Sequence, residues 1–383
     1  MLNLPIFLDN NSTTRVDDKV LETMLPYFSN HYGNAASKSH SLGWEASEAV
    51  NYAREQIALL IGSEPNEIIF TSGATESDNL ALKGVFEKYA SKGNHIITVA
   101  IEHKAVLDTC AHIENLGGEV SYLKVDSDGL ISLSELENSI QPNTILISVM
   151  YANNETGVIQ PIKEISAIAK KHGIIFFSDA TQAIGKIPVN VIEDGIDLMA
   201  FSAHKIYGPK GIGALYIRRK NPRVTLTQQM DGGGHEKGFR SGTLNVPGIV
   251  GFGKACEISR LQMIKESKRI RQLRDYFENE LLSLPDIKLN GSSLYRNPNT
   301  SNLSFKNKQG PNLLSTLSKN IAVSSGSACT SANLAPSHVL KAMGLEDELA
   351  LSSIRFSLGR FTTQEEIDYT ISSITNFSQN FAL

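Results

Sequence analysis

The stretch from Gly173 to Gly213 constrains the fold most strongly, because it holds two short apolar runs that each end in polar residues. The runs, Ile174 to Phe177 and Leu198 to Phe201, are continuous rather than alternating. Such runs are typical of strands that are buried on both faces of a parallel sheet. Asp179 follows the first run and Lys205 follows the second. In open α/β sheets the carboxyl ends of the strands border the ligand crevice, so these two side chains are predicted to face one ligand.

An aspartate and a lysine at two such strand ends suit pyridoxal phosphate (PLP). A lysine amine condenses with the aldehyde of this cofactor, and a carboxylate keeps its pyridine nitrogen protonated so that the ring can accept electrons. We therefore assign Lys205 to the covalent link and Asp179 to the pyridinium. A surface lysine and a helix-capping aspartate are the ordinary alternative. The order strand-Asp-x-x-Gln followed by strand-Ser-x-His-Lys argues against that alternative.

Strand, loop and helix alternate through residues 65–220, and this alternation predicts a parallel sheet covered by helices. At 383 residues the chain is longer than one typical core. We expect an α/β protein with a large, mainly parallel-sheet PLP-binding domain, residues 16–259, and a smaller α+β domain formed by residues 1–15 and 260–383. Helices are predicted at residues 16–31, 41–62, 78–90, 162–172 and 247–283.

Composition limits the classes of partner. The net charge of -4 argues against nucleic acid as a direct partner. No apolar run approaches the ~18–20 residues that a membrane helix needs, and the N-terminus lacks the pattern of a signal peptide. Three cysteines, an odd number in a long chain, fit a reducing compartment better than a disulfide framework. We therefore expect a soluble, cytoplasmic protein that does not bind membranes.

A small-residue turn follows the predicted strand at residues 68–70. The turn, Thr-Ser-Gly-Ala-Thr-Glu-Ser, leads into a predicted helix. Backbone N–H groups at such a helix start can approach an anion, and the helix dipole favours negative charge there. Gly73, Ala74 and Thr75 are the predicted donors to the phosphate of PLP. The alternative is an ordinary helix cap without a ligand.

Three further polar residues are candidates for the site. His103 lies just past a predicted strand, where its ring could stack on the pyridine and exchange protons, having an ordinary pKa near ~6.5; a purely structural histidine is the alternative. Asn154 and Gln182 also follow strands and are candidates for the phenolic oxygen of PLP, because buried amides need hydrogen-bond partners. Asn34, in a loop between two predicted helices, contacts substrate or only shapes a turn.

The three cysteines differ in their surroundings. Cys110 and Cys256 lie within predicted helices and are interpreted as core residues. Cys329 lies in a run of small polar residues, Ser-Ser-Gly-Ser-Ala-Cys-Thr-Ser-Ala, that predicts an exposed loop. A free thiol in such a loop favours a functional role for Cys329.

Motifs spread over nearly the whole chain resemble those of the cysteine desulfurases of the IscS/NifS family. They are TSGATESDNLALKG, EHKAVLDTC, NNETGVIQPI, DATQAIGK, SAHKIYGPKGIGALY, GGGHEKGFRSGT, SSGSACTSA and SSIRFSLGRFTT. The segment around Cys329 is similar to the long catalytic loop of the group I members. The resemblance implies the fold-type I architecture of PLP-dependent transferases and a homodimer in which both subunits contribute to each active site.

The resemblance also implies roles for individual residues. It assigns the cofactor ring to Lys205, Asp179, His103, Gln182 and Asn154. It assigns the phosphate to Ala74, Thr75, Ser202, His204 and, across the dimer, Thr243. Arg355 would clamp the substrate carboxylate, as a planar guanidinium can. Cys329, on a loop of the small domain, would accept the sulfur.

The implied reaction converts L-cysteine to L-alanine and leaves a persulfide on Cys329. Sulfur would pass to acceptor proteins such as an iron–sulfur scaffold, for cluster assembly or for thio-modification of tRNA. His103 or the substrate itself would help to deprotonate the thiol, since an ordinary thiol is mostly protonated at neutral pH. A selenocysteine lyase or a PLP aminotransferase on the same fold is the alternative enzyme, and a sulfur carrier without chemistry is the alternative outside enzymes.

Overall fold

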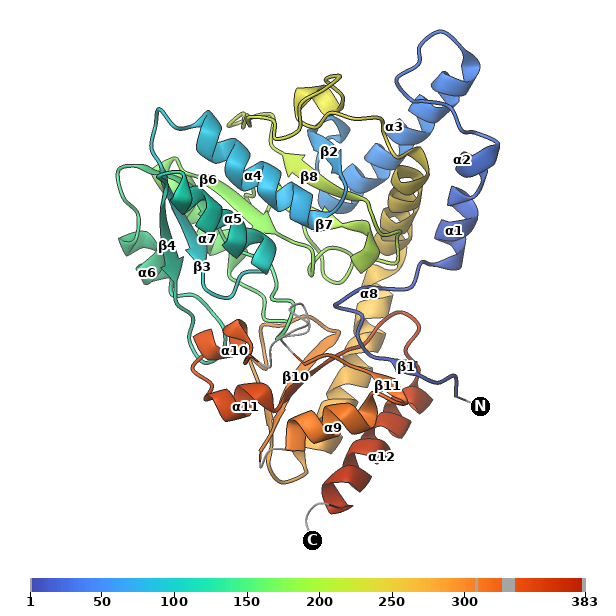
Figure 1. Cartoon of the computed structure of the whole chain (residues 1–383), viewed down its shortest axis with the longest axis vertical. Helices are drawn as coiled ribbons and strands as arrows, with labels where there is room; N and C mark the ends of the chain where they lie inside the picture. Colours follow the sequence, from blue (N-terminus) through green and yellow to red (C-terminus); the bar gives the residue numbers. More distant parts are fainter. Residues whose placement is uncertain (1, 307–308, 326–334, 381–383) are drawn as a thin grey trace.

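The computed structural model describes residues 2–306, 309–325 and 335–380, and it confirms an α/β fold built on one large sheet (Figure 1). This sheet has seven strands in the order β2-β8-β7-β6-β5-β3-β4. In that order the strands are Ile68–Thr71, Gly213–Ile217, Leu198–Ser202, Ile175–Asp179, Thr144–Ser148, His95–Val99 and Glu119–Leu123. Neighbouring strands are parallel except at β8, which runs antiparallel to β2 and β7. The sheet is therefore mostly parallel, as the continuous apolar runs predict.

Helices cover both faces of this sheet. Neighbouring residues of a strand point to opposite faces of the sheet. Ile69 and Leu198 pack with α4 and α5 on one face, whereas Phe70 and Met199 pack with α3, α7 and the first part of α8 on the other. The helices of these two layers are α4 (Ala74–Lys88), α5 (Lys104–Asn115), α3 (Ser41–Ile61), α7 (Ile162–His172) and α8 (Val246–Leu282). Burial on both faces explains why the strands read as continuous apolar runs.

A second core lies below the sheet in Figure 1. It contains a three-stranded antiparallel sheet in the order β12-β10-β9 and a parallel pair of β1 with β11. These strands are Ser353–Ser357, Thr300–Phe305, Ile287–Leu289, Ile6–Phe7 and Ile321–Ala322. The 37-residue helix α8 runs continuously from the first core into the second. The domain boundaries at residues 15 and 259 stay a prediction.

The other helices are shorter or lie at the ends of the chain. They are α1 (Asp18–Met24), α2 (Pro26–Ser29), α6 (Leu133–Asn138), α9 (Gln309–Leu317), α10 (His338–Ala342), α11 (Asp347–Leu351) and α12 (Gln364–Asn380). Single 3₁₀ turns occur at Pro65–Glu67, Ala203–Lys205 and Glu236–Gly238. In the described part of the chain, no helix has the length and apolar character needed to span a membrane.

Some elements differ from the sequence-based expectation. The helix expected over residues 16–31 is divided in two, because Pro26 has no N–H to continue the first helix and begins the second instead. The helix expected from Asp78 begins at Ala74, directly after Gly73. β8 is antiparallel because only a short connection joins it to β7, and parallel neighbours need a longer crossover.

Candidate active site

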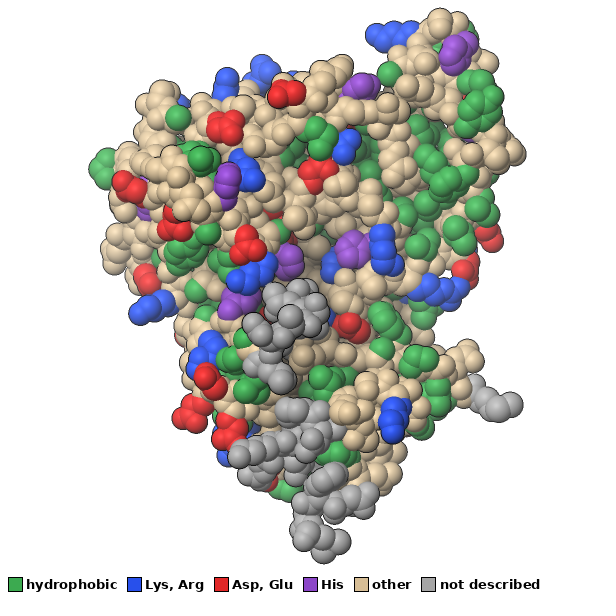
Figure 2. Space-filling view, in the orientation of Figure 1, with side chains coloured by type: hydrophobic (Ala, Val, Ile, Leu, Met, Phe, Trp, Pro, Cys, Tyr) green, Lys and Arg blue, Asp and Glu red, His purple; other side chains and the backbone are tan. Residues whose placement is uncertain are grey.

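A cavity of about 900 Å³ lies at the carboxyl ends of the parallel strands. Lysine, arginine and histidine side chains gather on this face, where the sheet meets the second core (Figure 2). The cavity brings together ten of the residues that the sequence proposes for the site. They are Ala74, Thr75, His103, Asn154, Asp179, Gln182, Ser202, His204, Lys205 and Arg355.

Lys205 ends the 3₁₀ turn that follows β7, so the strand delivers its amine to the cavity. Its Nζ donates to the backbone carbonyls of Asn11 and Ser12, at 2.6 and 2.7 Å. These carbonyls belong to the N-terminal segment, far from Lys205 in sequence. The amine is therefore held at a defined position on the cavity wall.

Asp179, the last residue of β6, lines the cavity. Two other buried carboxyls, Asp78 and Glu102, lie close to it. Burial, and then the charge of Asp179, raises the pKa of each well above its usual range. Three carboxyls so close together cannot all ionise in a region of low dielectric constant. The carboxylate of Asp179 at this strand end suits the pyridine nitrogen of the cofactor.

His103 caps helix α5, and this contact determines where its proton lies. Nδ1 accepts a hydrogen bond from the N–H of Ala105 at 3.1 Å. A neutral imidazole that accepts at Nδ1 carries its proton on Nε2. Burial lowers the pKa of His103, and the positive charge of Lys205 adds to this, against the opposite effect of Asp179. His103 is therefore neutral at pH 7, with an N–H at Nε2 that can donate a hydrogen bond.

The N-terminus of α4 borders the cavity and is suited to a phosphate group. Gly73 precedes the helix and offers no side-chain cap, so the first N–H groups of α4 are not taken by one. The nearest acid, Glu76, forms an ion pair with Arg240 at 2.9 Å, which neutralises its charge. An uncapped helix start, a buried carboxylate and a lysine amine in one cavity match the phosphate, pyridine nitrogen and aldehyde of PLP. The residues present thus fit this cofactor.

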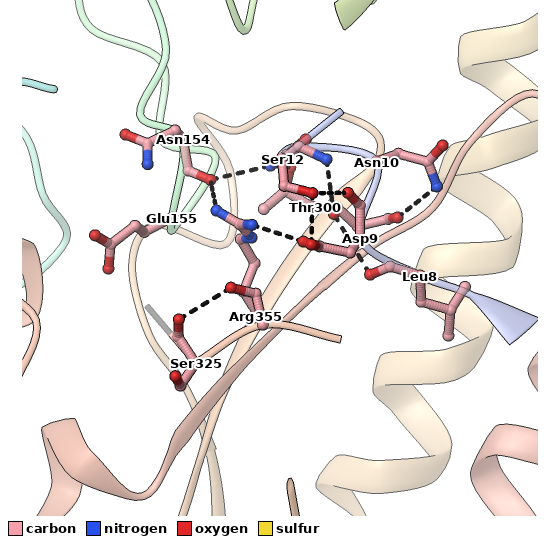
Figure 3. Close-up of polar contacts among 12 residues, drawn as sticks. Leu8, Asp9, Asn10, Ser12, Asn154, Glu155, Thr300, Ser325 and Arg355 are labelled. Carbon is pink, nitrogen blue, oxygen red and sulfur yellow. Dashed lines mark hydrogen bonds and ion pairs between the residues drawn. The ribbon is translucent and has the colours of Figure 1, made fainter. Parts of the chain in front are cut away.

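Arg355, at the centre of β12, extends into the cavity from the second core (Figure 3). Nη2 donates to Oδ1 of Asp9 at 2.7 Å, and Nη1 donates to the carbonyl of Asn154 at 3.1 Å. Among the described residues, its buried Nε makes no hydrogen bond. The guanidinium lines the cavity and is held in place by Asp9 and the carbonyl of Asn154, as a carboxylate site requires.

The sequence of this chain matches the family of class-V aminotransferases over residues 6–370. It is 55% identical over 371 residues to the cysteine desulfurase IscS of Anaeromyxobacter dehalogenans, covering 97% of this chain and 91% of the relative. The chain belongs to the cysteine desulfurase family. The cofactor of this family is PLP, in agreement with the chemistry of the cavity.

Solved structures show the same likeness. A NifS-like protein superimposes on this desulfurase chain with a TM-score of 0.91, at 41% identity, over 98% of this chain and all of the other. A structure described as SspA in complex with cysteine superimposes with a TM-score of 0.83, at 37% identity, over 94% of this chain and all of the other. The fold of the desulfurases therefore extends over essentially the whole chain.

Three residues proposed for the desulfurase site are not among those that line the cavity. The exposed Asn34 accepts a hydrogen bond from the N–H of Ala36 at 2.9 Å and shapes its own turn. Thr243 is exposed at the end of a glycine-rich segment. Cys329 lies outside the described residues; Ser324 and Ala335, on either side of that gap, both line the cavity. The roles of these three residues stay predictions.

The other two cysteines are core residues, as expected. Cys110 and Cys256 are buried. Burial raises the pKa of the Cys110 thiol to about 12 and raises that of Cys256 well above its usual range. Neither thiol is therefore a nucleophile at neutral pH.

Several residues of the desulfurase site escape sequence reasoning. Asp9, Asn11 and Ser12 line the cavity, and Glu155 and Ser337 do so from the loop after β5 and the start of α10. The N-terminal group lies in a polar run, Asp-Asn-Asn-Ser-Thr-Thr, that directly follows a short apolar strand. This is the same signal that identifies Asp179 and Lys205, and it could have marked the segment.

Proposed function

We propose that this protein is a cysteine desulfurase that converts L-cysteine to L-alanine and transfers the sulfur to Cys329 as a persulfide. One observation carries the proposal: Lys205, Asp179 and the guanidinium of Arg355 meet in a single cavity. A lysine and an aspartate can bind PLP, and an arginine can bind the carboxylate of an amino acid. The family of the chain agrees with this chemistry.

The residues divide the work of binding and proton transfer. Arg355 binds the substrate carboxylate, and Asp179 holds the pyridine nitrogen in its protonated form. Bound PLP supplies an electron sink that weakens bonds at Cα and Cβ of the substrate. Lys205 would hold the aldehyde of PLP, and its Nζ would act as the base at Cα of the substrate. His103 donates a hydrogen bond through Nε2, because its Nδ1 is occupied by the N–H of Ala105.

The sulfur step needs a thiolate but no external oxidant. The thiolate of Cys329 attacks the substrate sulfur, so an S–S bond forms and the Cβ–S bond breaks. The electron pair of the broken bond remains with the carbon skeleton, which takes up a proton and becomes alanine. The thiol of Cys329 gives its proton to the substrate, or to His103 once its Nδ1 has released the N–H of Ala105.

We further propose that the protein works as a homodimer and delivers sulfur to acceptor proteins such as an iron–sulfur scaffold. Exposed apolar side chains between α1 and α3 are evidence for a dimer interface. Leu25, Phe28 and Trp44 are 55, 63 and 58% exposed. Thr243 lies outside the cavity of its own chain, as a residue that serves the partner's phosphate site would. A second copy would cover the apolar side chains and complete each site.

Substitution of each cysteine in turn tests the proposal. Cys329→Ser should still bind PLP, but it should produce no alanine from L-cysteine and carry no added sulfur by mass spectrometry. Cys110→Ser and Cys256→Ser should keep the activity and lose some stability, because a hydroxyl replaces a thiol in an apolar core. Alanine formation by Cys329→Ser at the wild-type rate would contradict the desulfurase function and favour a lyase or an aminotransferase.

A further inference from the structure

Behind the cavity, the amine of Lys186 lies between two side-chain amides. Lys186 follows Gln182 by four residues in the turn after β6. Its Nζ donates to Oε1 of Gln182 and, at 3.0 Å, to Oδ1 of Asn11. Gln182 and Asn11 line the main cavity, whereas Lys186 lines a separate, smaller one of about 20 Å³. Lys186 therefore supports the cavity wall without being part of it.

Two backbone carbonyls determine which way both amides face. Nε2 of Gln182 donates to the carbonyl of Asn11 at 2.9 Å, and Nδ2 of Asn11 donates to the carbonyl of Asn154 at 3.1 Å. A carbonyl oxygen can only accept a hydrogen bond, so the nitrogen of each amide must face it. Both amide oxygens then face Lys186, whose amine supplies a donor to each.

The charge state of the amine does not alter this arrangement. Burial lowers the pKa of Lys186 well below its usual range, and the positive charges of Lys205 and Arg355 add to this effect. A neutral amine still carries two N–H groups, which match the two amide oxygens. Lys186 can therefore hold both amides without placing a second positive charge beside Lys205.

We propose that Lys186 is a positioning residue that, together with Asn11, orients Gln182 toward PLP. Nε2 of Gln182 carries a second N–H, which makes no hydrogen bond with the described residues. Because Gln182 lines the cavity, this N–H is placed to donate to the phenolic oxygen of the cofactor. With Lys186 removed, the amide of Gln182 keeps only its hydrogen bond to the carbonyl of Asn11 and is held less firmly. The inference rests on the proposed function, since it assumes PLP in this cavity.

The test measures the affinity of the cofactor-free protein for PLP. Lys186→Met and Gln182→Met should each weaken PLP binding about tenfold, which corresponds to about 1.4 kcal/mol. The double variant should bind no more weakly than Gln182→Met alone, because Lys186 acts only through Gln182. Lys171→Met is the matched control: it removes an exposed lysine of α7 and should leave the affinity unchanged.

Gln182→Glu keeps the experiment decisive if Lys186→Met fails to fold. A glutamate still offers an oxygen to Lys186, but it has no N–H for the phenolic oxygen or for the carbonyl of Asn11, so this variant should bind PLP at least tenfold more weakly. Wild-type affinity in Lys186→Met or in Gln182→Glu, or losses that add up in the double variant, would overturn the role of Lys186. Failure of the wild-type protein to bind PLP would instead contradict the proposed function.

Discussion

At the scale of single residues, Glu155 shows how a buried acid is held at the site. Its Oε2 accepts a hydrogen bond from Oγ of Ser337 at 2.5 Å, and Ser337 also caps α10. Burial raises the pKa of Glu155 to about 7, although the hydrogen bond from Ser337 and the charge of Arg355 oppose this effect. The carboxyl is therefore protonated in the folded protein at acidic pH, where the unfolded chain has already ionised it.

This pKa makes stability depend on pH in a defined direction. Between the ordinary value of 4.5 and about 7, the folded protein binds more protons than the unfolded chain, so the free energy of unfolding falls as pH rises. The full effect is on the order of 3 kcal/mol. Glu155→Gln should remove it: relative to wild type, the variant should gain stability from pH 5 to pH 8 in urea unfolding of the cofactor-free protein.

An exposed acid provides the control for Glu155. The hydrogen bond from Lys171 lowers the pKa of Glu137. A group with a lowered pKa stabilises the fold above its unfolded pKa, and this contribution is lost as pH falls. Glu137→Gln should therefore show no relative gain in stability toward pH 8. An equal gain in both variants would show that Glu155 is not responsible.

At the scale of elements, the start of α4 depends on a glycine in a neighbouring strand. Gly213, the first residue of β8, lies directly against the turn that precedes α4. A Cβ at Gly213 would lie 2.7 Å from Cα of Gly73 and 2.7 Å from the carbonyl of Phe201. No side chain fits there, so Gly213 lets the proposed phosphate site approach the sheet.

Gly213→Ala should therefore displace the turn and weaken PLP binding at least tenfold, with a loss of stability from overpacking of about 1–3 kcal/mol. Gly173→Ala is the comparison, because Gly173 has a φ of +67° and its Cβ would meet no atom within 4 Å. That variant should lose about 1 kcal/mol of stability from backbone strain alone. PLP titration and thermal unfolding of both variants separate the two effects. Equal PLP affinities in both variants would contradict the role of Gly213.

At the scale of the whole molecule, the segment from Gln229 to Thr243 is held firmly on the surface of its own chain. Glu236, within this segment, is buried, and its carboxylate forms an ion pair with Arg54 at 2.7 Å. Glu236 and Lys237 both have positive φ, a strained conformation that such contacts must support. The segment is thus fixed while Thr243 stays exposed, as a residue that acts in a second copy would be.

Mixing two variants tests this arrangement. Lys205→Ala cannot attach PLP covalently, and Thr243→Ala should bind its phosphate more weakly. If Thr243 serves the partner's site, a mixed dimer has one site with both Lys205 and Thr243 intact. After dissociation and reassembly, the mixture should therefore show tight PLP sites and desulfurase activity above the sum of the two separate variants. Activity equal to that sum would place Thr243 outside the partner's site.

Local sequence patterns predict the main sheet and the residues at the ends of its strands. The positions of Asp179 and Lys205 follow from buried apolar runs, because the carboxyl ends of parallel strands meet at one edge. Which of the two neighbouring asparagines, Asn153 or Asn154, faces the cavity is not evident from the sequence pattern. Oδ1 of Asn153 accepts from the N–H groups of Glu155 and Thr156, both at 2.9 Å, so Asn153 shapes the loop and Asn154 lines the cavity.

By itself, the sequence determined the fold class, the cofactor and the side chains that follow the buried strands, because each of these depends on short-range patterns of burial. Only the tertiary structure decided which distant groups hold those side chains in place. Asp9 binds Arg355 across 346 positions of sequence, and Asn11 meets Lys205 across 194. Nothing in the sequence distinguishes Lys186 from other lysines, and only the fold places its amine between the amides of Asn11 and Gln182. Such contacts depend on how the two cores pack together, and no local spacing of residues encodes that packing.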